Sequence, residues 1–173
     1  MNPKTVSKIH IQSFPPIATD LSHTLILGTM PGQASLKAGQ YYAHPRNAFW
    51  KIMVEILGIQ SGEPYETRTA AMAMAGIALW DVLQSCVRAG SLDSDIDNNT
   101  IVLNDFSWFF NCHPHIRRIC FNGTRAEYLY RRHVQPLLPA SPDREYIRLP
   151  STSPANAAIP IEEKSRAWKI IAS

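Results

Sequence analysis

Four short apolar runs divide the chain and predict four β-strands. In each run the apolar residues mostly follow one another instead of alternating with polar ones, which is typical of strands buried on both faces. The runs are TLILG (24–28), GIALWDV (76–82), RRICFNG (117–123) and EYIRLP (145–150). The pattern therefore predicts strands at the centre of a domain.

Segments between and after these runs carry helical patterns. In the first, the apolar side chains from Phe49 to Leu57 form one stripe, and Gly58 suits the end of a helix. The second has Pro64 near its start and Gly76 after its end, the usual asymmetry. The full set comprises 47–58, 63–76, 100–112, 124–138 (with Thr124 as a plausible N-cap) and 161–172.

The alternation of strands and helices predicts an α/β fold. We expect a three-layer α/β/α sandwich around a central, mostly parallel, four-stranded sheet. The length predicts a single domain over residues 1–173, in which residues 1–22 form an N-terminal extension packed on or near the core. Ligands of such folds bind beyond the carboxyl ends of the strands. Those ends are GTMPG, WDVLQS, FNGT and PSTSPAN.

Composition narrows the class of protein. Apolar residues make up 45% of the chain, no run is long enough to span a membrane, and the first residues lack the apolar segment of a signal peptide. We therefore expect a cytoplasmic protein, associated with the nucleoid. Cys86, Cys112 and Cys120 form no CxxC pair and predict reduced thiols, and the spacing of NCHPHIRRIC matches no zinc pattern. The net charge of +3 is compatible with a nucleic-acid ligand without requiring one.

The predicted loops exclude several kinds of catalysis. GTMPG offers backbone N–H groups to a ligand, but it lacks the ending of a Walker loop and the dinucleotide fingerprint. The chain has no GxSxG elbow and no obvious pair of carboxylates of the kind that sugar hydrolysis uses. Asp81 is the acid that the pattern places at a strand end. Tyr41 and Tyr42 offer flat faces for a planar ligand.

Two motifs, GTMPG…YYAHPRNAFW and the later STSPAN, resemble the uracil-DNA glycosylase superfamily. The resemblance is strongest to its hypoxanthine-DNA (deoxyinosine) glycosylase branch and covers nearly the whole chain from Leu25 to Asn156. It implies a monofunctional DNA repair enzyme that flips a deaminated base out of the helix and hydrolyses its N-glycosidic bond. It implies no cofactor and no metal.

The resemblance assigns roles to individual residues. Tyr42 is implied to stack on the flipped base, and Asn47 is implied to be catalytic, by holding water and binding developing charge. Taken alone, Asn47 reads as a helix N-cap. Ser151 is the second catalytic candidate, because its hydroxyl can donate to the leaving base. The implied substrate-binding residues are Gly28, Thr29, Met30, Pro31, Gly32, Tyr42, Phe49, Asp81, Ser153 and Asn156.

Three positions depart from the patterns of relatives that remove uracil. Met30 and Thr29 stand where many relatives have an acid or Asn that holds the attacking water, and Ser151 stands where they have His or Asn. These departures favour hypoxanthine over uracil. Asp81 stands where relatives have an Asn that reads the base edge, and we expect it as an ionised acceptor for N1–H of hypoxanthine, which would repel N1 of adenine.

The partner implied is double-stranded DNA containing a deaminated base, with single strands as a further substrate, and we expect a monomer. Phosphate contacts are predicted at Ser35, Lys37, His44 and Arg46, whereas Arg125, Arg131 and Arg132 are interpreted as a solvated helix face. Three alternatives stay open. They are a glycosylase for uracil, xanthine or another deaminated base, a protein that binds damaged DNA without cutting it, and a flavodoxin-like or nucleotide-binding hydrolase that shares only the fold.

Overall fold

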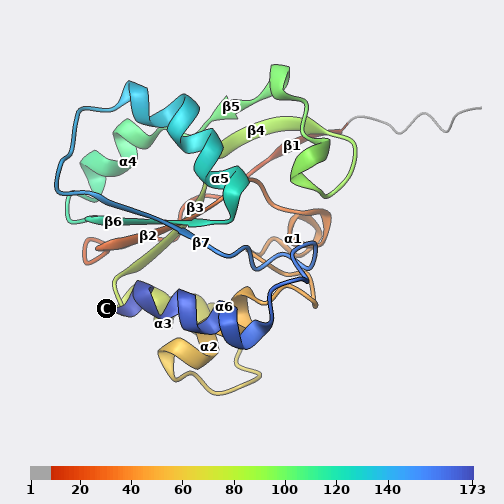
Figure 1. The fold of residues 1–173 in the computed structure, drawn as a ribbon, viewed down its shortest axis with the longest axis vertical. Coiled ribbons are helices and arrows are strands. Elements are labelled where there is room, and N and C mark those ends of the chain that lie inside the picture. Colours follow the sequence, from red (N-terminus) through yellow and green to blue (C-terminus); the bar gives the residue numbers. More distant parts are fainter. Residues whose placement is uncertain (1–8) are drawn as a thin grey trace, which may run out of the picture.

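A parallel four-stranded sheet forms the centre of the computed structural model, which describes residues 9–173 (Figure 1). Its strands lie in the order β3 (Ile77–Asp81), β2 (Thr24–Gly28), β6 (Arg118–Asn122) and β7 (Glu145–Leu149). All neighbouring pairs are parallel. These are the strands predicted from the apolar runs, so the predicted central sheet is confirmed.

Helices cover both faces of this sheet (Figure 1). One face packs on α4 (Phe106–Cys112) and α5 (Thr124–Leu129), and the other on α2 (Phe49–Leu57), α3 (Tyr65–Met74) and α6 (Ile161–Trp168). Successive strand residues serve opposite faces, as the strand geometry requires: Leu25 and Leu27 join the first cluster and Ile26 the second. The three-layer sandwich is therefore confirmed.

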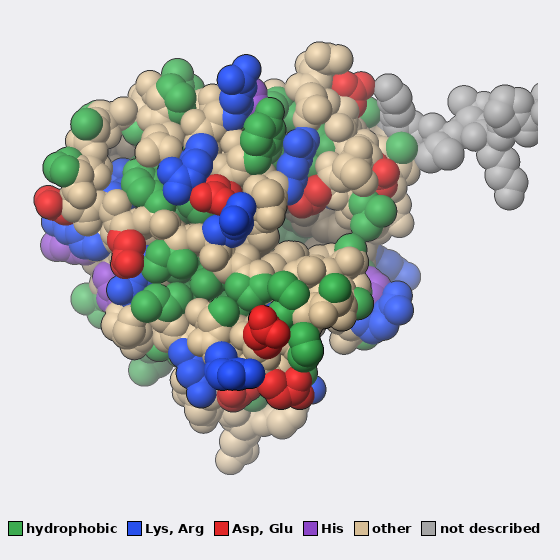
Figure 2. Space-filling model, viewed as in Figure 1, with side chains coloured by type: hydrophobic (Ala, Val, Ile, Leu, Met, Phe, Trp, Pro, Cys, Tyr) green, Lys and Arg blue, Asp and Glu red, His purple; other side chains and the backbone are tan. Residues whose placement is uncertain are grey.

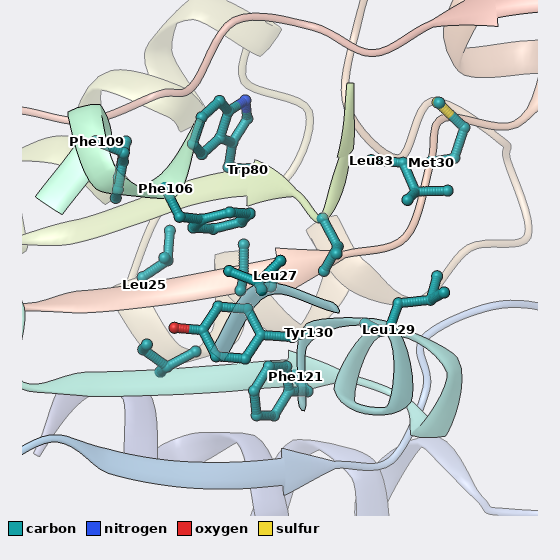
Figure 3. Close-up of a cluster of buried hydrophobic side chains, with 14 of the residues drawn as sticks. Leu25, Leu27, Met30, Trp80, Leu83, Phe106, Phe109, Phe121, Leu129 and Tyr130 are labelled. Carbon is teal, nitrogen blue, oxygen red and sulfur yellow. The ribbon is translucent and has the colours of Figure 1, made fainter. Parts of the chain in front are cut away.

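Aromatic side chains fill the layer between the sheet and α4 (Figure 3). The Trp80 ring on β3 lies 5.1 Å from that of Phe106 and 4.9 Å from that of Phe109, centroid to centroid. All are almost fully buried. Burying such a side chain contributes about 1.5–3 kcal/mol, so this layer anchors the strand whose last residue is Asp81.

A second sheet was not predicted from the sequence. It is antiparallel, in the order β1 (Ile9–Gln12), β4 (Leu83–Arg88) and β5 (Val102–Leu103). Part of the predicted N-terminal extension is thus a strand, while residues 1–8 lie outside the described residues. The segment 100–112 was predicted as one helix, but its start pairs with β4 as β5.

Two helical segments also differ from the prediction in detail. The short helix α1 (Gln33–Ala38) follows the GTMPG turn and was not predicted. The segment 124–138 changes after α5 into a π-helical turn over Tyr130–Val134 and then a 3₁₀ turn over Gln135–Leu137. Pro136 lacks the N–H that an α-helix would use there. Among the described residues, no helix is long and apolar enough to cross a membrane.

Candidate active site

A cavity of about 650 Å³ opens beyond the carboxyl ends of the central strands. Gly28 on β2 is paired with Asp81 on β3, so the ends of these strands meet at the same edge. The loop after β7 also lines the cavity, with residues Ser151–Asn156. Every site residue proposed from the sequence lines this cavity except Phe49 and Lys37. The topology therefore brings together residues from Gly28 to Asn156.

The turn from Gly28 to Gly32 forms one wall of the cavity. A methyl carbon added at Gly28 would lie 2.5 Å from Oδ1 of Asp81 and 2.8 Å from the Tyr42 hydroxyl, so only glycine allows both to approach. The Met30 side chain turns into the core (Figure 3), where it is 7% exposed. The buried Arg88 donates from Nη2 to the Pro31 carbonyl oxygen (2.6 Å), which fixes the turn from the protein side.

Tyr42 lines the cavity and adopts a left-handed backbone conformation, with φ of 54°. Its ring stacks on Phe49 with centroids 4.0 Å apart and an interplanar angle of 23°. Its hydroxyl is buried without a hydrogen-bond partner in the described chain, and burial raises its pKa further than the neighbouring Asp81 does. Phe49 is fully buried behind Tyr42. The prediction that Phe49 contacts substrate is therefore wrong, because Tyr42 lies between Phe49 and the cavity.

Asn47 lies one residue before Ala48, the N-cap of α2, and lines the cavity. Its Oδ1 accepts a hydrogen bond from the Phe49 N–H (3.0 Å), and its own N–H donates to the His44 carbonyl (2.8 Å). The Asn47 side chain thus satisfies the first N–H of the helix, as a capping side chain would, although the N-cap residue itself is Ala48. One lone pair of Oδ1 is therefore engaged, and the Nδ2 group remains available to donate to a ligand.

Asp81 is 3% exposed, and its Oδ2 has no hydrogen-bond partner in the described part of the chain. Burial raises the pKa of this carboxyl to about 8; the charge of Asp93 adds to the rise and Arg88 opposes it. The neutral acid therefore predominates at neutral pH. This raised pKa disfavours the expected ionised Asp81 at neutral pH, and the sequence could not show that the carboxyl is removed from water.

The segment from Ser151 to Asn156 is held in a series of tight turns. The Ser151 hydroxyl accepts from the Ser153 N–H (3.2 Å), and the Ser153 hydroxyl accepts from the Ala155 N–H (3.2 Å). Asn156 donates from Nδ2 to the Ser151 carbonyl oxygen (3.1 Å). Since both serine oxygens act as acceptors within these turns, their hydroxyl protons stay available to donate to a ligand.

Two elements outside the motifs fix this segment in place. Asn122, at the end of β6, donates from Nδ2 to the Thr152 hydroxyl and accepts from the Thr152 N–H, both at 2.9 Å. Lys164 on α6 is buried and donates from Nζ to the Asn156 carbonyl oxygen (2.7 Å). Burial lowers the pKa of Lys164. The second motif is therefore anchored to both the sheet and the last helix.

The cavity also contains residues that sequence reasoning missed. Asn122 belongs to the predicted strand-end loop FNGT, so the topology rule could have identified it. Ser91, Leu92 and Asp93 come from the connection between β4 and β5, which carries no motif. Asp93 begins a 3₁₀ turn (Asp93–Asp95). Only the fold brings this second carboxylate to the cavity of Asp81.

The predicted phosphate-binding residues fall into different environments. His44 and Arg46 line the cavity mouth, and Nδ1 of His44 accepts from the Arg46 N–H (3.1 Å). Lys37 is exposed in the last turn of α1, outside the cavity lining. Ser35 is 5% exposed, and its hydroxyl accepts from the Ala43 N–H. The predicted phosphate contact of Ser35 does not agree with this burial, so we assign Ser35 to bracing the loop.

The arginines of the α5 region lie among acidic side chains. Arg131 pairs with Glu127 one turn earlier (2.9 Å), and Arg125 donates to the Asn98 side chain. Figure 2 shows blue and red side chains interspersed over the part of this face where α5 and β7 lie in Figure 1. This mixture agrees with a solvated helix face for the exposed Arg131 and Arg132, whereas Arg125 is half-buried and its charge acts on Asp93 of the cavity.

Comparison with known proteins gives consistent matches. A family model described as the Uracil DNA glycosylase superfamily matches residues 15–172. A Methanosarcina barkeri protein named hypoxanthine DNA glycosylase is 37% identical over 117 residues, covering 66% of this chain and 72% of the relative. A Methanosarcina acetivorans protein of the same name is 34% identical over 162 residues, covering 92% of this chain and 96% of the relative. The solution NMR structure of a candidate uracil DNA glycosylase from Methanosarcina acetivorans matches with a TM-score of 0.77 and 31% identity, covering 95% of this chain and 97% of that one.

Proposed function

The chain belongs to the uracil DNA glycosylase superfamily, and from this premise we propose that it releases hypoxanthine from DNA by hydrolysing the N-glycosidic bond of deoxyinosine. Two relatives named hypoxanthine DNA glycosylase support the choice of base. The observation that carries the proposal is the cavity itself, in which Tyr42, Asn47 and Asp81 meet although they come from different elements.

Binding of the flipped base follows from this geometry. Extruding a base costs a few kcal/mol, and stacking on an aromatic ring returns about 1–3 kcal/mol. Tyr42 can offer such a surface because Phe49 supports its ring from behind. A neutral Asp81 carboxyl offers one acceptor and one donor, which match the N1–H donor and the O6 acceptor of hypoxanthine.

The same argument favours a second class of substrate. Uracil and xanthine also present an N–H beside a carbonyl, so a neutral Asp81 can pair with them in the same way. A neutral Asp81 also pairs with N1 and the amino group of adenine, so rejection of adenine by repulsion applies only when the carboxyl is ionised. We therefore include uracil and xanthine in the test.

Cleavage of the bond needs hydrogen-bond donors toward the leaving purine. The Nδ2 group of Asn47 and the hydroxyls of Ser151 and Ser153 are free to donate, and groups fixed in advance stabilise developing charge. Among the described residues, no lysine lines the cavity. This supports a monofunctional enzyme that leaves an abasic site without cutting the strand.

The remaining parts of the proposal concern the DNA and the state of the protein. We propose duplex DNA as the main substrate, a monomeric enzyme, and a cytoplasmic location associated with the nucleoid. The mouth of the cavity carries Arg46 and His44, which suit phosphate groups beside a flipped nucleotide. Exposed large apolar side chains of the described chain, such as Met74, Trp108 and Leu137, belong to separate elements. This scatter favours a monomer.

Base release from defined duplexes tests the proposal. Labelled DNA with one deoxyinosine, deoxyuridine or deoxyxanthosine is incubated with the protein, and alkali reveals abasic sites. We expect release of hypoxanthine and a loss of at least about 100-fold in Asn47→Ala, because a preorganised donor is removed. Asn111→Ala, on exposed α4 surface outside the cavity, is the control. If the protein binds deoxyinosine DNA but releases no base, it is a damage-binding protein without catalysis.

A further inference from the structure

The cavity contains few groups that can take a proton from water. Hydrolysis, as proposed above, requires an acceptor for a proton of the attacking water, and this inference rests on that proposed function. Asn47 is excluded because an amide is not a base near neutral pH and its Oδ1 already accepts from the helix. Thr29 and Met30 supply no basic group. The titratable acceptors that remain in the lining are His44, Asp81 and Asp93.

His44 and Asp81 are both poorly suited to this task. Nδ1 of His44 accepts from the Arg46 N–H, so in the neutral ring the proton lies on Nε2, which then only donates. Asp81 is 3% exposed and lies against Gly28 and the Tyr42 hydroxyl. With a pKa raised to about 8, its carboxyl already holds a proton at neutral pH.

Asp93 differs from Asp81 in having several groups around it that stabilise its negative charge. It enters the cavity from the 3₁₀ turn between β4 and β5. The groups that face it are the Thr29 hydroxyl from the turn after β2, Arg88 from β4 and Arg125 from α5, and each of them lowers its pKa against the effect of burial, which is larger and raises it. Its charge in turn raises the pKa of Asp81 on β3 and that of Tyr42.

The contrast between the two carboxyls suggests a division of labour. Two acids in one site whose surroundings differ commonly take different protonation states and different roles. We propose that Asp93 is the general base of this enzyme, accepting a proton from the water that attacks C1′ of the flipped deoxyinosine. The neutral Asp81 then serves the base edge, and Asn47 serves the leaving group as a donor.

The proposed step balances without any further reactant. The C1′–N9 bond breaks and its electron pair leaves with the purine, while the water oxygen forms a bond to C1′. One water proton passes to the Asp93 carboxylate, and the purine anion takes a proton from solvent. Asp93 releases its proton to solvent before the next turnover. The products are hypoxanthine and an abasic deoxyribose that carries a hydroxyl at C1′.

Single-turnover excision of hypoxanthine by Asp93→Asn tests this role. We expect the rate to fall by about 100-fold or more, because general-base catalysis contributes roughly 10²–10⁴-fold. Affinity for deoxyinosine DNA and the thermal midpoint should stay near wild type, because the substitution keeps the shape of the side chain. Asp95→Asn is the matched control, since Asp95 lies in the same turn but outside the cavity lining.

Two further measurements separate catalysis from folding. The wild-type rate should rise with pH as Asp93 loses its proton, and that rise should be absent in Asp93→Asn. Formate should restore part of the activity of Asp93→Ala, because a small carboxylate can occupy the vacated space, and it should not restore Asn47→Ala. A purely structural role of Asp93 would show neither effect.

The outcomes distinguish this inference from the proposed function. Wild-type protein that releases no hypoxanthine contradicts the proposed function itself. A second outcome would overturn the role of Asp93 alone. In it, wild-type protein releases hypoxanthine, the excision rate of Asp93→Asn stays within about threefold of the wild-type rate, and its pH profile is unchanged. If Asp93→Asn does not fold, the wild-type pH profile and formate rescue of Asp93→Ala decide in its place, and a flat profile without rescue overturns the inference.

Discussion

Asp81 and Tyr42 bring to the cavity two buried polar atoms that have no hydrogen-bond partner among residues 9–173. Oδ2 of Asp81 and the Tyr42 hydroxyl are both buried, and the same hydroxyl and Oδ1 of Asp81 both approach Gly28. An unpartnered buried polar group costs about 1–3 kcal/mol. Sites retain such costs where a ligand supplies the missing partners, and hypoxanthine presents a donor and an acceptor that fit.

Replacing Asp81 by Asn should make the protein more stable at alkaline pH. Folding raises the pKa of Asp81 from its ordinary 3.8 to about 8, so the folded state binds the proton more tightly than the unfolded state. The wild-type free energy of unfolding therefore decreases as pH rises from about 4 to about 8. Asn is neutral throughout this pH range. The free energy of unfolding of Asp81→Asn should therefore exceed that of wild type by a few kcal/mol near pH 8, at about 1.4 kcal/mol per unit of pKa shift.

Denaturant unfolding near pH 5 and pH 8 measures this difference. The exposed Asp143→Asn is the control and should change stability at neither pH. Equal pH dependence in wild type and Asp81→Asn would contradict a buried, protonated Asp81.

At the scale of elements, the site depends on how the segment Ser151–Asn156 is attached. The segment has no regular secondary structure, and its position comes from Asn122 on β6 and Lys164 on α6. Ala48 at the start of α2 also donates from its N–H to the Thr152 carbonyl oxygen (3.0 Å). The second motif is thus tied to Asn47, one residue before Ala48, through the backbone.

Removing the Asn122 side chain should loosen this segment. Asn122→Ala leaves the buried Thr152 N–H and hydroxyl without their partner, so we expect a loss of about 1–3 kcal/mol in stability and slower base excision. Combined with Thr152→Val in a double-mutant cycle, the two changes should cost less than their sum. Simple additivity would show that the pair is not coupled. Thr69→Val, on the remote helix α3, serves as control.

At the scale of the whole molecule, basic residues near the cavity differ from those on α5 in their partners. Arg46 is exposed at the cavity mouth, whereas Arg131 is paired with Glu127 and Glu127 also faces Arg148. A Lys or Arg side chain that neutralises a DNA phosphate releases counterions from the DNA, which favours binding. The position of such side chains should therefore decide how the protein lies on DNA.

Salt dependence of DNA binding checks this arrangement. Arg46→Ala should weaken binding to any duplex and reduce the slope of log affinity against log salt by about 1, because one phosphate contact is lost. Arg132→Ala, exposed after α5, is the matched control and should leave the slope unchanged. A larger effect at Arg132 would place the DNA over α5 instead.

Which parts of the fold could be predicted depends on how local their signal is. The central strands carry continuous apolar runs, and the helices carry stripes at helical spacing, so both follow from short stretches of sequence. The strands β1, β4 and β5 do not. β1 and β5 are largely exposed, β4 has polar residues among its buried positions, and the pairing joins residues far apart, such as Ile9 and Arg88. The edge of the sheet at which the loops meet followed from the topology rule for parallel strands.

The sequence by itself determined the residue types at the site, the strand ends that hold them, and the resemblance to glycosylases. Only the tertiary structure decided that Phe49 lies behind Tyr42 and that Asp93 shares the cavity with Asp81. The reason is physical. A pKa and a free hydrogen-bonding group depend on removal from water and on charges such as Arg88 and Arg125, which the fold brings close from distant positions in the chain.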